Sequence, residues 1–203
     1  MNIILSAILF SSLLLITGCH KDGVKKDYYP NGKLESETPY TNGQINGLQK
    51  YYWESGGIMV ETPFKENKMN GLVKDYYEGG KLQSEIPYTA SKINGIQKDY
   101  YEDGTVRAET PYMDDKINGI QKTWHRNGNI QFENPYKDSR LNGIQKLYNG
   151  DGKLIVETPY TNDTIKGIRK SYSENGKLQS ETIFINGKEA GTKNCDNNGN
   201  EVK

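Results

Sequence analysis

Residues 94–117 read NGIQKDYYEDGTVRAETPYMDDKI, and this stretch decides the fold. Its apolar side chains recur at a spacing of two residues, which is the period of a β-strand. The dipeptide Asp103-Gly104 separates two such runs and supplies the positive φ that a hairpin turn requires. The stretch therefore predicts one β-hairpin.

The hairpin recurs along the chain every 24 residues. Gly95 belongs to a series of glycines that runs from Gly23 to Gly191, and a second series, nine residues later, contains Gly104. A lysine, a glutamate and an aromatic residue keep the same phase in seven units. A fixed period of this kind is typical of repeat architectures, in which each unit packs on its neighbours. We expect an all-β array of antiparallel β-hairpins that forms an extended single-layer meander of about fourteen strands.

Two registers of the hairpin turn predict different faces for the side chains. A loop of three residues pairs Tyr100 with Val106 and places Lys98 opposite Ala108. A turn of two residues places Lys98 opposite Glu109 instead and separates Tyr100 from Val106. We expect the first register, because an exposed ion pair contributes only about 0 to 1 kcal/mol. It gathers these apolar side chains on one face: Ile96, Tyr100, Val106, Ala108 and Tyr112.

Proline and glycine mark the ends of the strands. Pro111 has no N–H group, so we expect the ladder of hydrogen bonds to finish near it. Gly95 opens the first strand, where a bulge or the close approach of a neighbouring tyrosine ring would exclude a Cβ atom.

The first eighteen residues differ in composition from the rest of the chain. Residues 3–16 form an apolar run interrupted by three serines, which is too short to span a bilayer and is typical of a signal peptide. The sequence Ile16-Thr17-Gly18-Cys19 then resembles the lipobox of bacterial lipoproteins. The resemblance implies a signal helix over 1–18, acylation of Cys19, and a lipid anchor that holds residues 19–203 in the cell membrane or the outer membrane. Cys195 is then left without an intramolecular disulfide partner.

Composition excludes several classes of function. The chain has 26 Lys and Arg residues and 26 Asp and Glu residues, so it has no net charge with which to hold nucleic acid. Two His and two Cys residues are too few for a metal site, and we expect no metal and no cofactor. Lysines and glutamates that recur seven times indicate a scaffold, since an active site needs one constellation. We expect the protein not to be an enzyme.

A row of residues that follow the repeated aromatic position is the candidate site for a partner. The row is aromatic in the first four repeats and polar afterwards: Tyr29, Trp53, Tyr77, Tyr101, His125, Asn149 and Ser173. One interpretation is that these side chains cover the second face of a thin sheet. The other is that Tyr29, Trp53, Tyr77 and Tyr101 form an exposed strip that docks a protein or a glycan. The fifth repeat departs from the others at Trp124 and His125, which join the candidate contact residues.

The pattern K-x-Y-Y-x-x-G-x-L-x-x-E-x-P-Y, which fits residues 26–40, 74–88 and 98–112, resembles the bacterial variant of the MORN repeat. The resemblance covers residues 22–203, with seven repeats over 22–189 and a degraded repeat over 190–203. More narrowly, the arrangement resembles the YwqK-like antitoxin family, whose name implies binding and neutralising a toxin.

Together these features predict a lipid-anchored, non-catalytic module that binds or scaffolds proteins at the cell envelope. Its partners are expected to be the bilayer, through acylated Cys19, and a toxin or a surface protein, with a glycan as a further option. The alternative function is that of an antitoxin or immunity protein that neutralises one toxin.

Overall fold

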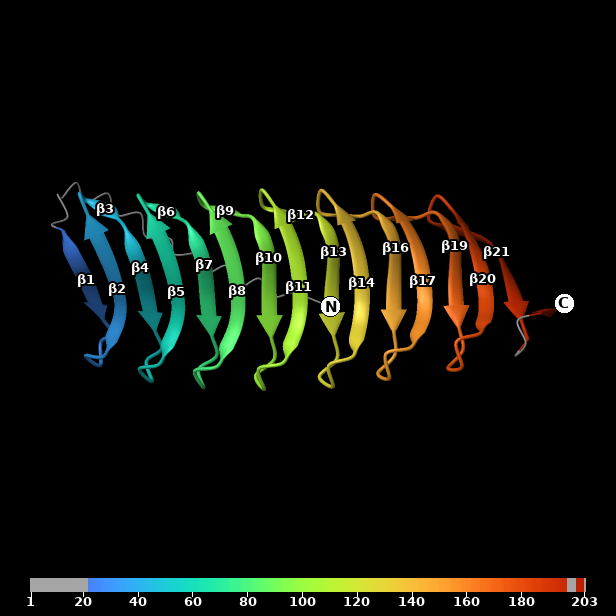
Figure 1. Ribbon diagram of the computed structural model, residues 1–203, viewed down its shortest axis with the longest axis horizontal. Coiled ribbons are helices and arrows are strands. Elements are labelled where there is room, and N and C mark those ends of the chain that lie inside the picture. The colour runs from blue at the N-terminus through green and yellow to red at the C-terminus, as the bar shows by residue number, and fades with distance from the viewer. Residues whose placement is uncertain (1–21, 197–199, 203) are drawn as a thin grey trace.

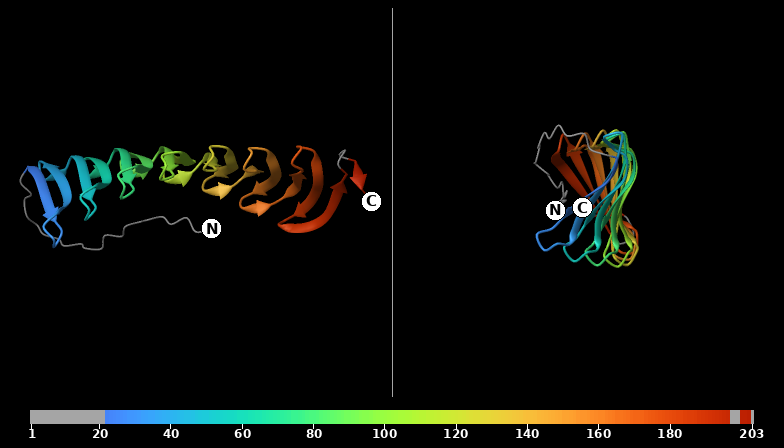
Figure 2. Two further views of the ribbon diagram at one scale, coloured as in Figure 1. Left: turned by 90° about the horizontal axis from the view of Figure 1, so that it is seen from below. Right: turned by 90° about the vertical axis from the view of Figure 1, so that its left-hand side faces the viewer.

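The computed structural model describes residues 22–196 and 200–202, which form one antiparallel β-sheet. The strands follow one another across the sheet in chain order, so that the array is a single-layer meander (Figure 1). The sheet is bent across its strands and twists along the array (Figure 2). The expected signal helix and Cys19 lie outside the described residues. Within the described residues, no helix is long and apolar enough to cross a membrane.

Each repeat contributes a strand of six residues and a strand of eight. The six-residue strands are β1 (Gly23–Tyr28), β4 (Gly47–Tyr52), β7 (Gly71–Tyr76), β10 (Gly95–Tyr100), β13 (Gly119–Trp124), β16 (Gly143–Tyr148) and β19 (Gly167–Tyr172). The eight-residue strands are β2 (Leu34–Thr41), β5 (Ile58–Lys65), β8 (Leu82–Thr89), β11 (Val106–Met113), β14 (Ile130–Lys137), β17 (Leu154–Thr161) and β20 (Leu178–Ile185).

Shorter segments raise the number of assigned strands above the expected fourteen. Two-residue strands precede most of the six-residue strands: β3 (Gln44–Ile45), β6 (Lys68–Met69), β9 (Lys92–Ile93), β12 (Lys116–Ile117), β15 (Arg140–Leu141) and β18 (Thr164–Ile165). The degraded last repeat adds β21 (Lys188–Cys195) and β22 (Glu201–Val202), so that the described residues form 22 strands. Cys195 is a free, half-buried thiol at the end of β21.

The hairpin loop is the predicted loop of three residues. In the fourth repeat the N–H of Tyr101 donates to Thr105 O (2.8 Å), and the N–H of Gly104 donates to Tyr101 O (2.8 Å). Gly104 has a φ of 92°, which closes the loop in the left-handed region. Tyr100 pairs with Val106, as the favoured register requires.

The rest of that register is wrong, because a β-bulge follows the first pair. Asp99 pairs with Ala108 and Lys98 pairs with Glu109, so that Arg107 is an extra residue in β11. The bulge recurs at the same place in all seven hairpins. One extra residue reverses the alternation of side chains, which lets the apolar pair and the ion pair form together.

The bulge also corrects the expected grouping of apolar side chains. Ile96, Lys98 and Tyr100 share one face with Glu109, which we call the charged face. Asp99 and its partner Ala108 lie on the other face, together with Tyr112, and we call this the small-residue face. The buried side chains of the described part all lie there: Ser36, Thr38, Thr62, Val73, Ser84, Ala108, Thr110 and Thr158.

Proline does not end the ladder, which was the expectation. Pro111 pairs with Ile96 inside β11, and the strand continues to Met113. The neighbouring strand breaks opposite it instead, between β12 and β13, where the N–H of Asn118 donates to Pro111 O (2.9 Å). Pro111 has no N–H group with which to donate in return, so the regular ladder is interrupted at this place.

The repeated glycine approaches this proline and not a tyrosine ring. A Cβ atom on Gly119 would lie 3.0 Å from Pro111 Cγ, and the φ of Gly119 is 121°. Glycine is therefore required both by the backbone conformation and by the proline of the preceding repeat.

Candidate partner-binding surface

The charged face is a nearly invariant scaffold. In the fourth repeat, Lys98 Nζ lies 3.3 Å from Glu109 Oε1, and equivalent ion pairs recur along the array. The Tyr100 hydroxyl donates to Glu85 Oε2 of the preceding repeat (2.9 Å). Burial, followed by this hydrogen bond, raises the pKa of Tyr100 to about 12. Four glutamates, Glu37, Glu61, Glu85 and Glu133, each link the lysine of their own hairpin to the tyrosine of the next repeat.

The predicted aromatic row runs along the hairpin loops and is half-buried. The hydroxyl of Tyr77 donates to Tyr100 O (2.8 Å), and that of Tyr101 donates to Trp124 O (2.8 Å). Tyr29 makes the same bond to Tyr52 O. These rings cover the loop of the next repeat and join it through a hydrogen bond. The row is therefore not the exposed strip that one interpretation required, and docking on it stays a prediction.

Three other candidate residues lie in or beside this row. Trp53 is half-buried, and its buried Nε1 has no hydrogen-bond partner among the described residues. His125 Nε2 lies 3.5 Å from Tyr148 O, so that histidine replaces tyrosine in the row. Trp124 occupies the repeated aromatic position on the charged face and pairs with Ile130. The guanidinium of Arg126 stacks 4.7 Å from the centroid of the Tyr101 ring, which adds one more contact between repeats.

The small-residue face carries the chemistry that differs between repeats. One position on it, that of Asp99, is occupied along the array by Asp27, Tyr51, Asp75, Asp99, Thr123, Leu147 and Ser171. The facing position, that of Ala108, is occupied by Ser36, Val60, Ser84, Ala108, Phe132, Val156 and Ser180. The pair is an aspartate with a small residue in the first, third and fourth repeats, tyrosine with valine in the second, threonine with phenylalanine in the fifth, and leucine with valine in the sixth.

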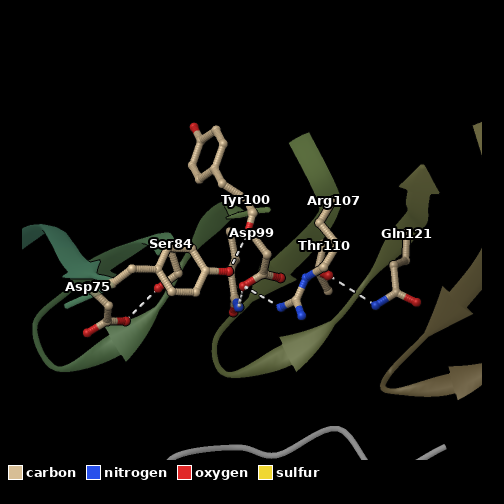
Figure 3. A network of polar contacts seen from close by, with 9 residues as sticks. Asp75, Ser84, Asp99, Tyr100, Arg107, Thr110 and Gln121 are labelled. Atoms are coloured by element: carbon tan, nitrogen blue, oxygen red, sulfur yellow. Dashed lines mark hydrogen bonds and ion pairs between the residues drawn. The ribbon is translucent and has the colours of Figure 1, made fainter. Parts of the chain in front are cut away.

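Polar side chains occupy the acidic part of this face (Figure 3). Ser84 donates a hydrogen bond from its hydroxyl to Asp75, and Arg107 Nη2 lies 3.8 Å from Asp99 Oδ1. Burial raises the pKa of the Asp75 carboxyl. No basic side chain of the described residues forms an ion pair with Asp75. The hydroxyl of Ser84 is therefore the neighbour that the structure gives this carboxyl, without a cation beside it among the described residues.

The apolar part of the face contains a shallow hollow of about 260 Å³. Phe132, Leu147 and Val156 are its adjacent walls, since Leu147 pairs with Phe132 on one side and with Val156 on the other. Tyr160, Ile165 and the exposed guanidinium of Arg169 complete the lining, together with Gln145 and Thr158. The hollow has the composition of a pocket for one large apolar side chain with a polar group beside it.

A row of amide and hydroxyl side chains lies on the small-residue face, beside the hollow. Gln121 donates from Nε2 to Thr110 Oγ1 (3.0 Å), and Gln145 donates to Asn134 Oδ1 (2.8 Å). Asn134 donates in turn to Gln121 Oε1 (3.1 Å). Asn134 holds a position that is threonine in five of the other repeats and Ile86 in the third. It joins two neighbours, so that the floor beside the hollow is a continuous chain of hydrogen bonds.

Sequence reasoning missed this face because the bulge was not foreseen. The signal is present in LESETPY, residues 34–40, where Ser36, Thr38 and Tyr40 alternate with Glu37 and Pro39. That alternation places the small residues and the glutamate on opposite faces, whatever the register of the turn.

The family described as the MORN repeat variant matches seven segments of the chain, residues 21–42, 45–66, 69–90, 93–114, 117–138, 141–162 and 166–186. The chain belongs to this family. Each matched segment contains both strands of one hairpin, the six-residue strand and the eight-residue strand, so the MORN repeat is the structural unit of the array. No curated protein matches the chain. Among the described residues, no group of His, Cys, Asp and Glu side chains is placed to hold a metal ion.

Proposed function

We propose that this chain is a lipid-anchored, non-catalytic module of the cell envelope that binds a protein partner on its small-residue face. MORN repeats are generally modules that bind proteins or membranes, and the array offers two faces to do so. The observation that carries the proposal is the concentration of unrepeated chemistry on one face. Asp75 and Asp99 mark its acidic part, and the hollow between Phe132 and Val156 marks its apolar part.

The two parts suit a polypeptide that lies across the strands. A basic side chain over Asp75 would neutralise a half-buried carboxylate that has no cation of its own among the described residues. A large apolar side chain would fill the hollow beside Leu147 and remove its walls from water, which contributes about 25 cal/mol for each Å² buried. Arg169 lies at the rim of the hollow, where its guanidinium would donate hydrogen bonds to a carboxylate or a carbonyl of the partner.

A lipid anchor would place the first repeat near a membrane. Cys19 precedes the first residue of β1 by four positions, and four residues of extended chain span at most roughly 14 Å. Acyl chains on Cys19 contribute on the order of 0.8 kcal/mol per buried methylene, and several chains hold a protein to a bilayer almost permanently. The array would then begin at the surface of the cell membrane or the outer membrane and extend away from it.

The absence of catalysis is part of the proposal. The charged side chains that recur are used in Lys–Glu–Tyr contacts that repeat along the array, such as Lys50 with Glu61 and Tyr76. His125 lies in the aromatic row and contacts a backbone carbonyl. A scaffold needs such groups in every repeat, whereas a catalyst needs one unrepeated set.

Capture of partners from an envelope extract tests the site. The full chain carrying Phe132→Ser and Val156→Ser should recover at least tenfold less of any protein that the natural chain captures, because the hollow loses its walls. Met113→Ser is the matched control, since Met113 is 54 % exposed and lies away from the hollow. Equal capture by the natural chain and the double variant, at similar thermal unfolding, would show that the partner binds elsewhere.

The second candidate function, an antitoxin or immunity protein, is favoured by the resemblance to the YwqK-like antitoxins. In that case the small-residue face would hold one secreted toxin. The decisive observation is genetic: deletion of this gene should be lethal only while an adjacent toxin gene remains, and harmless deletion in the presence of every neighbouring gene would exclude it.

A further inference from the structure

An exposed apolar row runs along the charged face through all seven repeats. It consists of the second residue of each six-residue strand: Val24, Leu48, Leu72, Ile96, Ile120, Ile144 and Ile168, which are 40 to 57 % exposed. Six of these residues face a proline across the hairpin, as Ile96 faces Pro111, and Ile168 faces Ile183. Aliphatic and proline side chains therefore alternate along one edge of the face, where the aliphatic side chains are exposed and the prolines are half-buried.

A second row lies beside the apolar row on the same face. It alternates in charge without interruption across neighbouring strands, in the order Lys26, Glu37, Lys50, Glu61, Lys74, Glu85, Lys98, Glu109, Lys122, Glu133, Lys146, Glu157, Lys170 and Glu181. The row begins with lysine and ends with glutamate. Its net charge is zero, so it offers no attraction to an anionic lipid surface.

We propose that the charged face binds a second copy of this chain, with the two arrays antiparallel and related by a two-fold axis parallel to the strands. The ordering of the charges selects this arrangement. Such an axis reverses the order of the row along the array but keeps its position along the strands. Because the row begins with lysine and ends with glutamate, every lysine then meets a glutamate of the other copy. An axis along the array would keep the order and bring lysine to lysine.

The same operation pairs the apolar rows. Each aliphatic side chain of one copy meets a proline or Ile183 of the other, because aliphatic and cyclic residues alternate in step with the charges. A partner that follows an apolar row along seven repeats must have the same spacing between its repeats, and a second copy has it. A stable interface needs about 800 Å² from each partner, a small share of the 13305 Å² that the chain exposes.

The two-fold axis fixes which residues of the two copies lie opposite each other. The axis passes through the middle of the charged row, between Lys98 and Glu109 of the fourth repeat. Lys98 of one copy then lies opposite Glu109 of the other. The two-fold axis repeats this contact, so that the interface contains the Lys98–Glu109 pair twice. These two residues are the most sensitive place to test the proposal.

Complementary charge reversal distinguishes contacts between copies from contacts within one copy. The full chain, purified in detergent, should give a dimer in native mass spectrometry, and Lys98→Glu alone or Glu109→Lys alone should weaken it at least tenfold. Each variant then carries like charges both in its hairpin and across the axis. When the two variants are mixed, with one labelled with nitrogen-15, opposite charges meet across the axis, and a mixed dimer should form although neither variant dimerises alone.

The apolar row has its own test and control. Ile96→Asn with Ile120→Asn should also weaken the dimer at least tenfold, whereas Val202→Asn should not, since Val202 is 53 % exposed but lies in β22. A natural chain that is monomeric at every concentration, or mixed charge variants that stay monomeric, would overturn the proposal. It would also be overturned if the same variants reduced binding to phosphatidylglycerol vesicles while the natural chain remained monomeric, since the face would then bind lipid.

Discussion

The two faces of this sheet are built from the same strands, yet they vary very differently along the array. On the charged face the sequence of aliphatic residue, lysine and aromatic residue recurs in every repeat, as at Ile96, Lys98 and Tyr100. On the small-residue face the position of Asp99 holds aspartate, tyrosine, threonine, leucine or serine. The comparison indicates that the invariant face repeats one set of contacts between neighbouring repeats, while the contacts of the variable face differ from repeat to repeat.

The largest expected effect on stability comes from a substitution at the repeated glycine that lies against the proline of the preceding repeat. Gly71 has a φ of 126°, and a Cβ atom there would lie 2.9 Å from Pro63 Cγ. Gly71→Ala should therefore destabilise the array by about 2 kcal/mol or more, through backbone strain and the clash with proline. Urea unfolding followed by circular dichroism measures the effect.

Two further variants separate the causes of that loss. Gly57→Ala should change the free energy of unfolding by less than about 0.5 kcal/mol, because Gly57 has no positive φ and its nearest neighbouring atom would be 3.8 Å away. Pro63→Ala added to Gly71→Ala should recover part of the loss. Equal effects of the two glycine substitutions would show that the proline contact does not constrain the repeat.

A smaller effect tests whether the charged face links the repeats. The Tyr76 hydroxyl donates to Glu61 Oε2 (2.9 Å), and the Tyr100 hydroxyl donates to Glu85 Oε2 (2.9 Å). Tyr76→Phe and Tyr100→Phe should each cost about 1 kcal/mol, the usual contribution of such a hydrogen bond. Tyr28→Phe should cost little, because Tyr28 belongs to the first repeat and is 58 % exposed.

The same tyrosines predict a loss of stability at high pH. Burial and the hydrogen bond to glutamate raise the pKa of Tyr76 and Tyr100 to about 12, whereas an unfolded tyrosine loses its proton near pH 10, about its ordinary value. Between these values the unfolded chain binds fewer protons than the folded chain. Stability should be full below pH 10 and fall as the pH rises towards 12, with a shallower fall in the double Phe variant. An unchanged slope in that variant would contradict the link.

The smallest effect concerns a turn that belongs to neither face. Ala90 has a φ of 50° in the two-residue turn between β8 and β9. Asparagine tolerates the left-handed region better than alanine, so Ala90→Asn should stabilise the array by about 0.5 kcal/mol. Thr89→Asn, in the extended strand β8, should give no such gain. Thermal unfolding of the three chains compares them, and a loss at position 90 would show that the turn does not limit stability.

The hairpin unit and its loop could be predicted from sequence because their signals are local. Asp103-Gly104 selects a loop of three residues through the conformation that only glycine adopts readily, and the structure confirms that loop. Which side chains of the two strands share the small-residue face could not be predicted in the same way. Arg107 is one extra residue whose bulge depends on pairing with β10, and a single extra residue exchanges the two faces.

The aromatic row shows the same division between local and tertiary information. The sequence placed Tyr77 and Tyr101 one residue after the repeated aromatic position, on the side away from Tyr76 and Tyr100. Only the packed array shows that each hydroxyl reaches a carbonyl 23 positions further along the chain. That contact depends on the distance and twist between repeats, which no single hairpin determines.

The sequence by itself therefore determined the period of 24 residues, the antiparallel hairpin and the order of the strands, because turn chemistry and the alternation of side chains act over a few neighbouring residues. The tertiary structure decided which side chains share a face, how glycine and proline of adjacent repeats meet, and where Phe132, Leu147 and Val156 gather into a hollow. These features depend on pairing between strands that are distant in the chain, where one bulged residue outweighs the local pattern.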